Sequence, residues 1–129
     1  VVALTVRDSR FALGSNAYSA IWLSAETVGV TGPTGPTGEQ AISATILALV
    51  DRCRIDGTGI GGANGLFAQG VGFASALNLS VRDSSIDGLR GAGIRVEKQD
   101  EGNASLTVER SQIMRCGWVS NPDPDPLTD

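Results

Sequence analysis

The chain has 129 residues, enough for one domain, with a formal net charge of −4 and no histidine. Charges of both signs are scattered along the chain, so no basic surface for nucleic acid is expected. The absence of histidine removes the commonest general base and the commonest zinc ligand. The longest apolar run, Ile46–Val50, is far too short for a membrane-spanning helix, so no membrane span is expected.

One eight-residue phrase recurs four times without a gap, and internal repetition of this kind predicts a stacked repeat architecture. Each copy has apolar residues at its first, third and eighth positions. The copies are Leu4–Phe11, Ala48–Ile55, Leu79–Ile86 and Leu106–Ile113. A short alternating segment follows each of the first three copies and predicts a second strand in the same repeat. These segments are Ile21–Leu23, Leu66–Ala68 and Ile94–Val96.

The connections between these strands are expected to be loops and corners. Residues 31–38 have glycine at every third position, but the run is too short for a collagen helix and predicts an extended surface loop. Glycine-rich corners are expected at Asp56–Gly65 and at Asp87–Gly93. The proline-rich segment 121–129 lacks ladder donors and should form a tail outside the sheets. Residues 1–120 are expected to form the repeat domain, as part of a longer solenoid.

Stacking the four phrases in parallel register would create continuous apolar columns and two columns of alternating charge. The first charged column reads Arg7, Asp51, Arg82 and Glu109, and the second reads Asp8, Arg52, Asp83 and Arg110. Opposite charges are favoured and like charges disfavoured across neighbouring strands, so this alternation indicates parallel, in-register stacking. The next column contains Ser9, Cys53, Ser84 and Ser111 and predicts a small side chain at a tight corner. We therefore expect Cys53 and Cys116 to be free thiols, because they belong to repeats that are two rungs apart.

The phrase Leu-x-Val-x-x-Ser-x-Ile, followed by Gly-Ile-x-Val, resembles the parallel β-helix repeats of the pectate-lyase-like superfamily. Similar repeats occur in phage tailspikes and bacterial surface proteins. The resemblance implies an all-β, right-handed parallel β-helix of about four rungs with long inter-strand loops. It also implies an extracellular, cell-surface or virion-associated location, with polysaccharide as a partner. The fold hosts lyases, hydrolases and non-catalytic fibres alike, so it does not itself indicate an activity.

Candidate site residues fall into two groups. Asp56 and Asp87 occupy equivalent positions on adjacent rungs, where they could hold Ca²⁺, act as an acid and nucleophile pair, or simply form Asp-Gly turns. Arg54 is a basic candidate beside them. Trp22 and Trp118 are candidates for stacking against a sugar, although Trp22 could instead pack beneath residues 24–40. Arg95 and Lys98 follow the third rung and could contact a ligand or be solvated loop charges.

Two functions from different classes are compatible with the sequence. The first is a non-catalytic structural or binding module of a larger surface, phage-tail or secreted assembly, in contact with glycans and without a cofactor. The alternative is a carbohydrate-active enzyme, either a polysaccharide lyase or a glycoside hydrolase, or a fragment of one. In both cases the open ends of the solenoid should be covered by the tail, by a flanking segment or by another protein chain.

Overall fold

A computed structural model describes residues 1–14, 16–28, 42–61 and 64–117 of the chain. The described residues form twelve strands and no helix. Their bounds are β1 (Val2–Arg7), β2 (Arg10–Ala12), β3 (Ser19–Val28), β4 (Ile42–Ser43), β5 (Thr45–Asp51), β6 (Arg54–Gly61), β7 (Asn64–Val71), β8 (Ala76–Arg82), β9 (Ser85–Leu89), β10 (Ala92–Gln99), β11 (Asn103–Glu109) and β12 (Gln112–Met114).

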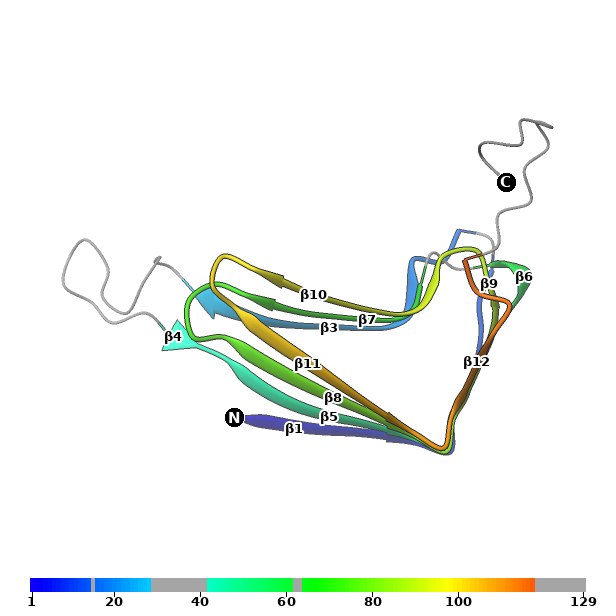
Figure 1. The fold of residues 1–129 in the computed structure, drawn as a ribbon, viewed down its shortest axis with the longest axis horizontal. Helices are drawn as coiled ribbons and strands as arrows, with labels where there is room; N and C mark the ends of the chain where they lie inside the picture. The colour runs from blue at the N-terminus through cyan, green and yellow to red at the C-terminus, as the bar shows by residue number, and fades with distance from the viewer. Residues whose placement is uncertain (15, 29–41, 62–63, 118–129) are drawn as a thin grey trace.

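The strands form three sheets that surround a common core (Figure 1). The strand orders are β1-β5-β8-β11, β2-β6-β9-β12 and β3-β7-β10, with the short β4 antiparallel to the end of β3. Every other pairing is parallel. Successive strands of one sheet therefore belong to successive repeats, and the predicted all-β parallel β-helix of about four rungs is confirmed.

The register agrees with the alignment of the four phrases. Val6, Val50, Val81 and Val108 are partners in sequence along the first sheet, and Leu4, Ala48, Leu79 and Leu106 form a parallel column. Phe11, Ile55, Ile86 and Ile113 do the same in the second sheet. The inward side chains of these columns are fully buried only in the two middle rungs, because each of those rungs has a neighbour on both sides. Val50 and Val81 are at most 1% exposed, whereas Val108 in the last rung is 40% exposed.

The corner between the first and second sheets has the same backbone in all four rungs. Asp8, Arg52, Asp83 and Arg110 each have φ between 47° and 52°, the left-handed region that non-glycine residues seldom occupy. In three of the four rungs the next residue is a serine whose hydroxyl donates to the carbonyl two residues earlier, as Ser84 Oγ does to Arg82 at 2.7 Å. Ser84 Oγ also accepts a bond from the Cys53 backbone N–H at 3.1 Å. The small-residue column therefore stabilises the corner and joins adjacent rungs.

The cysteine prediction is confirmed, since both Cys53 and Cys116 are free thiols. Cys53 is 3% exposed and occupies the serine position of the second rung. Its Sγ lies 3.4 Å from the carbonyl oxygen of Asp51, a weak version of the serine contact, and 3.4 Å from that of Val6 in the first rung.

Two expectations need correction. The corner predicted at Asp56–Gly65 is mostly strand: β6 continues to Gly61, with an irregularity in its pairing to β9 between Asp56 and Gly61. Ladder partners are present on both sides of this irregularity, at Asp56 and at Gly61. Asp51, predicted on the outer face, is only 3% exposed because Arg7 and Arg52 lie against its carboxylate at 3.5 and 3.1 Å. The predicted loop at residues 31–38 and the tail at 121–129 lie outside the described residues.

Candidate functional site

Three aromatic side chains gather on the outer face of the third sheet, and we call Tyr18, Trp22 and Phe67 the aromatic cluster. Trp22 of β3 is the register partner of Phe67 in β7. Their ring centroids lie 5.8 Å apart with an interplanar angle of 87°, an edge-to-face contact. Tyr18, just before β3, contacts both, with centroids 5.5 Å from Trp22 and 6.0 Å from Phe67. The cluster is therefore held by two strands and by its own ring contacts.

Exposure differs sharply within the cluster. Phe67 is 4% exposed and forms its base, whereas Tyr18 is 49% and Trp22 is 60% exposed. An exposed tryptophan fixed on a rigid sheet is a surface that loses little conformational entropy when a ligand binds. Trp22 lies on the outer surface, as the alternation of β3 predicts. The alternative, packing beneath residues 24–40, involves residues 29–41, which are outside the described part of the chain.

Charged and polar side chains border the cluster along the next strand. Arg95 of β10 is the register partner of Phe67, and its guanidinium carbon lies 5.5 Å from the centre of the Phe67 ring. The Arg95 side chain also donates to Glu97 Oε1 at 2.6 Å, which fixes its orientation. One position further along the outer face, Gln69 Nε2 donates to Ser24 Oγ at 2.9 Å. Hydrogen-bonding groups thus lie next to an exposed aromatic surface.

The structure brings together only some of the predicted ligand-binding residues. Trp22 and Arg95 lie on either side of Phe67, because both are register partners of Phe67 in the third sheet. Lys98 is exposed three residues further along β10, a spacing that places it on the opposite pleat from Arg95. Trp118 lies outside the described residues.

Tyr18 and Phe67 were missed at the level of sequence. The signal for Phe67 was present, because Ile21–Leu23 and Leu66–Ala68 are aligned copies of the same short strand. Tyr18 had no such signal, because it precedes the strand.

The aspartate pair is the second predicted site. Asp56 and Asp87 are register partners on β6 and β9, with side chains 23% and 19% exposed. Arg115 donates through Nε to Asp87 Oδ1 at 2.8 Å and through a terminal nitrogen to Oδ2. Arg54 lies 3.8 Å from the carboxylate of Asp56. The hydrogen bond from Arg115 lowers the pKa of the Asp87 carboxyl, and the charges of Arg115 and Arg54 act in the same direction.

This arrangement restricts what the aspartates can do. A lowered pKa keeps Asp87 ionised at neutral pH, which suits a nucleophile or an ion-pair partner and not a general acid. Two guanidinium groups already lie beside the carboxylates and would compete with Ca²⁺ for them. Within the described residues no cluster of three or more His, Cys, Asp or Glu side chains could hold a metal ion.

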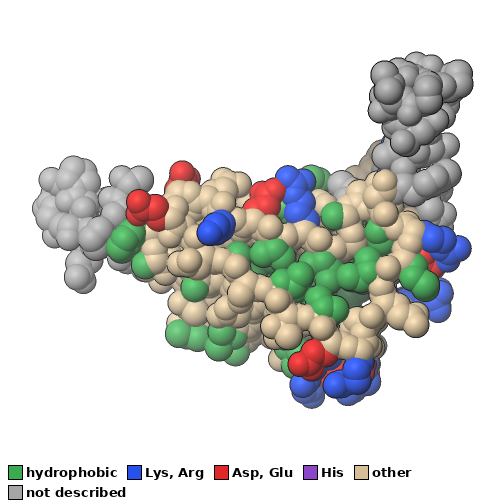
Figure 2. All heavy atoms as spheres, viewed as in Figure 1, with side chains coloured by type: hydrophobic (Ala, Val, Ile, Leu, Met, Phe, Trp, Pro, Cys, Tyr) green, Lys and Arg blue, Asp and Glu red, His purple; other side chains and the backbone are tan. Residues whose placement is uncertain are grey.

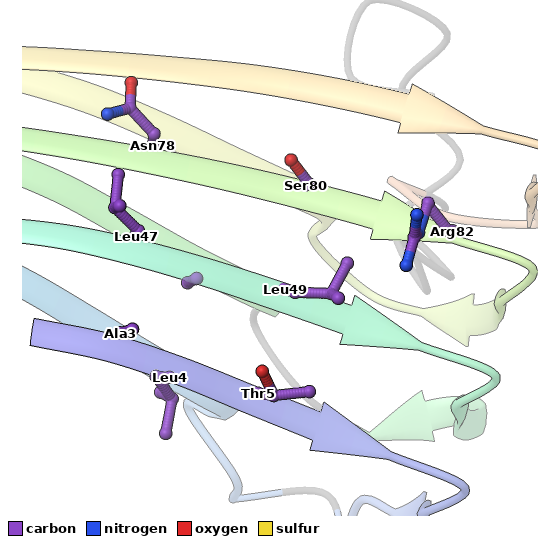
Figure 3. A pocket seen from close by; sticks show the side chains of 9 residues that line it. Ala3, Leu4, Thr5, Leu47, Leu49, Asn78, Ser80 and Arg82 are labelled. Carbon is purple, nitrogen blue, oxygen red and sulfur yellow. The ribbon is translucent and has the colours of Figure 1, made fainter.

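An open groove crosses the outer face of the first sheet over β1, β5 and β8, with a volume of about 320 Å³. Leu47 and Leu49 of β5 point toward Asn78 and Ser80 of β8 (Figure 3). Arg82 lies at one end, and its Nε is buried without a hydrogen-bond partner in the described structure. The groove contains no aromatic residue, so we regard it as a weaker site than the aromatic cluster.

The described part of the chain has no helix with the length and hydropathy needed to cross a membrane. Comparison of the chain with protein-family models, with curated proteins and with solved structures gives no match.

Proposed function

We propose that this chain is a non-catalytic β-helix module that contacts glycans through the aromatic cluster. The observation that supports this function is Trp22, which is 60% exposed yet held edge-on against Phe67 on a rigid sheet. A pyranose ring presents C–H groups on one face, and the electron-rich face of an indole attracts such positively polarised hydrogens. Tyrosine and tryptophan combine an apolar body with a polar tip, which suits a ligand that is both apolar and hydroxylated.

The neighbouring polar groups support the same chemistry. Binding sites for small ligands combine apolar and aromatic contacts with a few placed hydrogen-bonding groups that fix orientation. Here Ser24 and Gln69 share a hydrogen bond at 2.9 Å, and Arg95 and Glu97 form a second pair. Each of these groups can exchange its present partner for a sugar hydroxyl. The parallel pairing of β3, β7 and β10 fixes the backbone at these four residues, so a ligand would meet a preformed surface.

The wider setting is also a proposal. The repeat phrase resembles those of the pectate-lyase-like superfamily, and we assign the module to that superfamily on its phrase alone. We place it in a larger surface, phage-tail or secreted assembly, in an extracellular or virion-associated location. Its partner would be a polysaccharide.

The test is a glycan array that contains neutral and acidic polysaccharide fragments, followed by calorimetry on each hit. The Trp22→Ala variant should bind about ten-fold more weakly or worse, as expected when an aromatic anchor is removed. Leu47→Ala is the matched control, because Leu47 is also an exposed outer-face residue, at 46%, but belongs to another sheet. The proposal fails if no glycan binds, or if Trp22→Ala and Leu47→Ala bind equally well.

The alternative function is a carbohydrate-active enzyme, and the register pairing of Asp56 with Asp87 supports it. The test is product release from a panel of polysaccharides, with and without Ca²⁺, by the wild type and by Asp56→Ala and Asp87→Ala. Turnover that disappears in both variants would establish the enzyme and overturn the non-catalytic proposal. Binding without turnover on any substrate would reject the enzyme.

A further inference from the structure

Within the described residues, both ends of the first and second sheets are apolar edges that no further strand covers. Side chains that are buried in the middle rungs are between 38% and 58% exposed in the first and last rungs. They are Val2 and Leu4 at the first rung, and Leu106, Val108 and Ile113 at the last. Figure 2 looks along the stack and shows a band of hydrophobic side chains uncovered at the end in view. An edge of this kind is a template for pairing with another chain.

The backbone at the corner gives each end a defined polarity. At each corner, the residue with positive φ donates its backbone N–H to a carbonyl of the next rung. The acceptor is the last residue of that rung's first-sheet strand. Asp8 donates to Asp51, Arg52 to Arg82 and Asp83 to Glu109, each at 3.1 Å. Arg110 has the same backbone conformation but no following rung in the described chain. The Arg7 carbonyl occupies the acceptor position, with no preceding rung in the described chain to donate to it.

The charges at the two ends are complementary as well. Both charged columns alternate in sign, and an even number of rungs leaves opposite signs at the two ends. The last rung ends in Glu109 and Arg110, and the first rung begins with Arg7 and Asp8 at the same positions. A first rung placed on a last rung would therefore continue both alternations, with Glu109 facing Arg7 and Arg110 facing Asp8. Within the chain, the junction with this sign order is the one between the second and third rungs, where the charge of Arg52 acts favourably on Asp83 without a direct ion pair. The hydrogen-bonded pairs of Arg52 with Asp8 and of Arg110 with Asp83 lie at the other two junctions.

We propose that two copies of this chain stack end to end, with β11 and β12 of one copy paired in parallel to β1 and β2 of the second. The internal register, extended by one rung, places Leu106 on Leu4, Val108 on Val6 and Ile113 on Phe11 of the second copy. The contact involves the first two sheets. At the third sheet, β4 already pairs with part of β3 at the first rung. A second copy is the proposed partner because its first rung presents the signs that continue both charged columns and the Arg7 carbonyl that the Arg110 N–H can reach.

Mixed disulfide cross-linking tests this geometry on the full chain. Thr107 and Thr5 are exposed on the outer face of the last and first rungs, and the extended register makes them direct partners. Adjacent strands lie about 4.8 Å apart, within the Cα separation that a disulfide accepts. Thr5→Cys and Thr107→Cys proteins are mixed under mild oxidation and run on a non-reducing gel. The wild type, treated in the same way, measures any dimer that forms through Cys53 or Cys116. Leu47→Cys replaces Thr5→Cys in a matched control, because Leu47 is exposed but lies on the second rung.

The expected result is a covalent dimer in the Thr5→Cys and Thr107→Cys mixture, about ten-fold above either variant alone and above the Leu47→Cys mixture. A dimer of Thr107→Cys alone would show that two last rungs pair, and would overturn the proposal. Equal yields in all mixtures, or no dimer in any, would overturn it too. Sedimentation velocity of the wild type provides a second readout that needs no variant. The weight-average mass should rise with concentration, and a monomer at every concentration, as expected if residues 118–129 cover the last rung, would contradict end-to-end stacking.

Discussion

Arg52 and Asp8 are 44 positions apart in the chain, yet they form a two-point contact between the corners of neighbouring rungs. Arg52 Nε lies 2.7 Å from Asp8 Oδ1, and a terminal nitrogen lies 3.1 Å from Oδ2. The same geometry recurs between the third and fourth rungs, where Arg110 contacts Asp83 at 2.8 and 3.1 Å. These exposed ion pairs contribute little stability each. Their repetition fixes which corner lies above which, so we interpret them as determinants of register.

Acid pH should weaken the corners. Hydrogen bonds from arginine lower the pKa of Asp8, Asp83 and Asp87 from the ordinary value of 3.8. A carboxyl with a lowered folded pKa stabilises the protein above its unfolded pKa, and this contribution is lost as the pH falls through the folded value. The midpoint of thermal unfolding should therefore stay nearly constant from pH 7 to about pH 5 and decrease below about pH 4.

The control for this pH experiment is the Arg52→Gln/Arg110→Gln double variant, which removes the hydrogen bonds that lower the pKa of Asp8 and Asp83. Its midpoint should be lower than that of the wild type at pH 7 and should decrease less on acidification. An identical acid decrease in both proteins would mean that these pairs do not contribute.

Position in the stack should decide the cost of a core deletion. Leu79 and Leu106 occupy the same column on adjacent rungs but are 2% and 40% exposed. Leu79→Ala leaves a cavity in the closed core and should lower the free energy of unfolding by about 2–5 kcal/mol. Leu106→Ala removes a side chain that is already partly in water and should cost about 1 kcal/mol or less. Chemical denaturation of both variants measures the difference, and equal losses would contradict the described burial.

Close approach of two backbones leaves no room for a side chain at Gly70. A Cβ at Gly70 would lie 2.1 Å from the carbonyl oxygen of Asn103, where the start of β11 passes close to β7. Gly70→Ala should therefore cost about 1–3 kcal/mol, because backbone and not a side chain must move. Gly14→Ala is the matched control, since a Cβ there meets nothing within 4 Å and the change should stay within about 0.5 kcal/mol. A tolerated Gly70→Ala would show that the two segments lie further apart.

The serine column should behave as a structural bond between rungs. Ser84 is 6% exposed, donates to Arg82 at 2.7 Å and accepts from Cys53 N–H at 3.1 Å. Ser84→Ala leaves that buried N–H without its partner and should cost about 1–3 kcal/mol in the free energy of unfolding. Ser80→Ala, on the outer face of the preceding strand β8, should change it by less than about 0.5 kcal/mol. Similar values for the two variants would argue against a role for the hydroxyl at the corner.

Much of the fold could be predicted because the repeat encodes it directly. Four gapless phrases with apolar columns at fixed positions allow only one register, and each predicted partner of Val81 and Ile86 is observed. The burial of Asp51 could not be predicted, because it depends on Arg7 and Arg52 folding across its carboxylate. Alternating signs also did not guarantee contact. Arg82 stands between two acids of its column, yet it forms no ion pair within the described residues.

The candidate site was less accessible from the sequence. Trp22 and Arg95 could be named individually, but their connection through Phe67 emerges only when the short second strands of the three repeats are aligned with one another. The partner of Asp87, Arg115, follows the last phrase and belongs to no repeated position, so its contact arises from the path of the chain after β12. Side chains that act across rungs are predictable only where the repeat itself includes them.

The four phrases stack in parallel and in register, and methyl NMR tests this arrangement most directly. With valine methyl groups labelled, NOEs should connect Val50 with Val81 and Val81 with Val108, because these pairs lie on adjacent strands about 4.8 Å apart. Val50 and Val108, two rungs apart, should give no NOE. A direct Val50–Val108 contact, or the absence of the Val50–Val81 contact in the folded protein, would contradict the parallel β-helix.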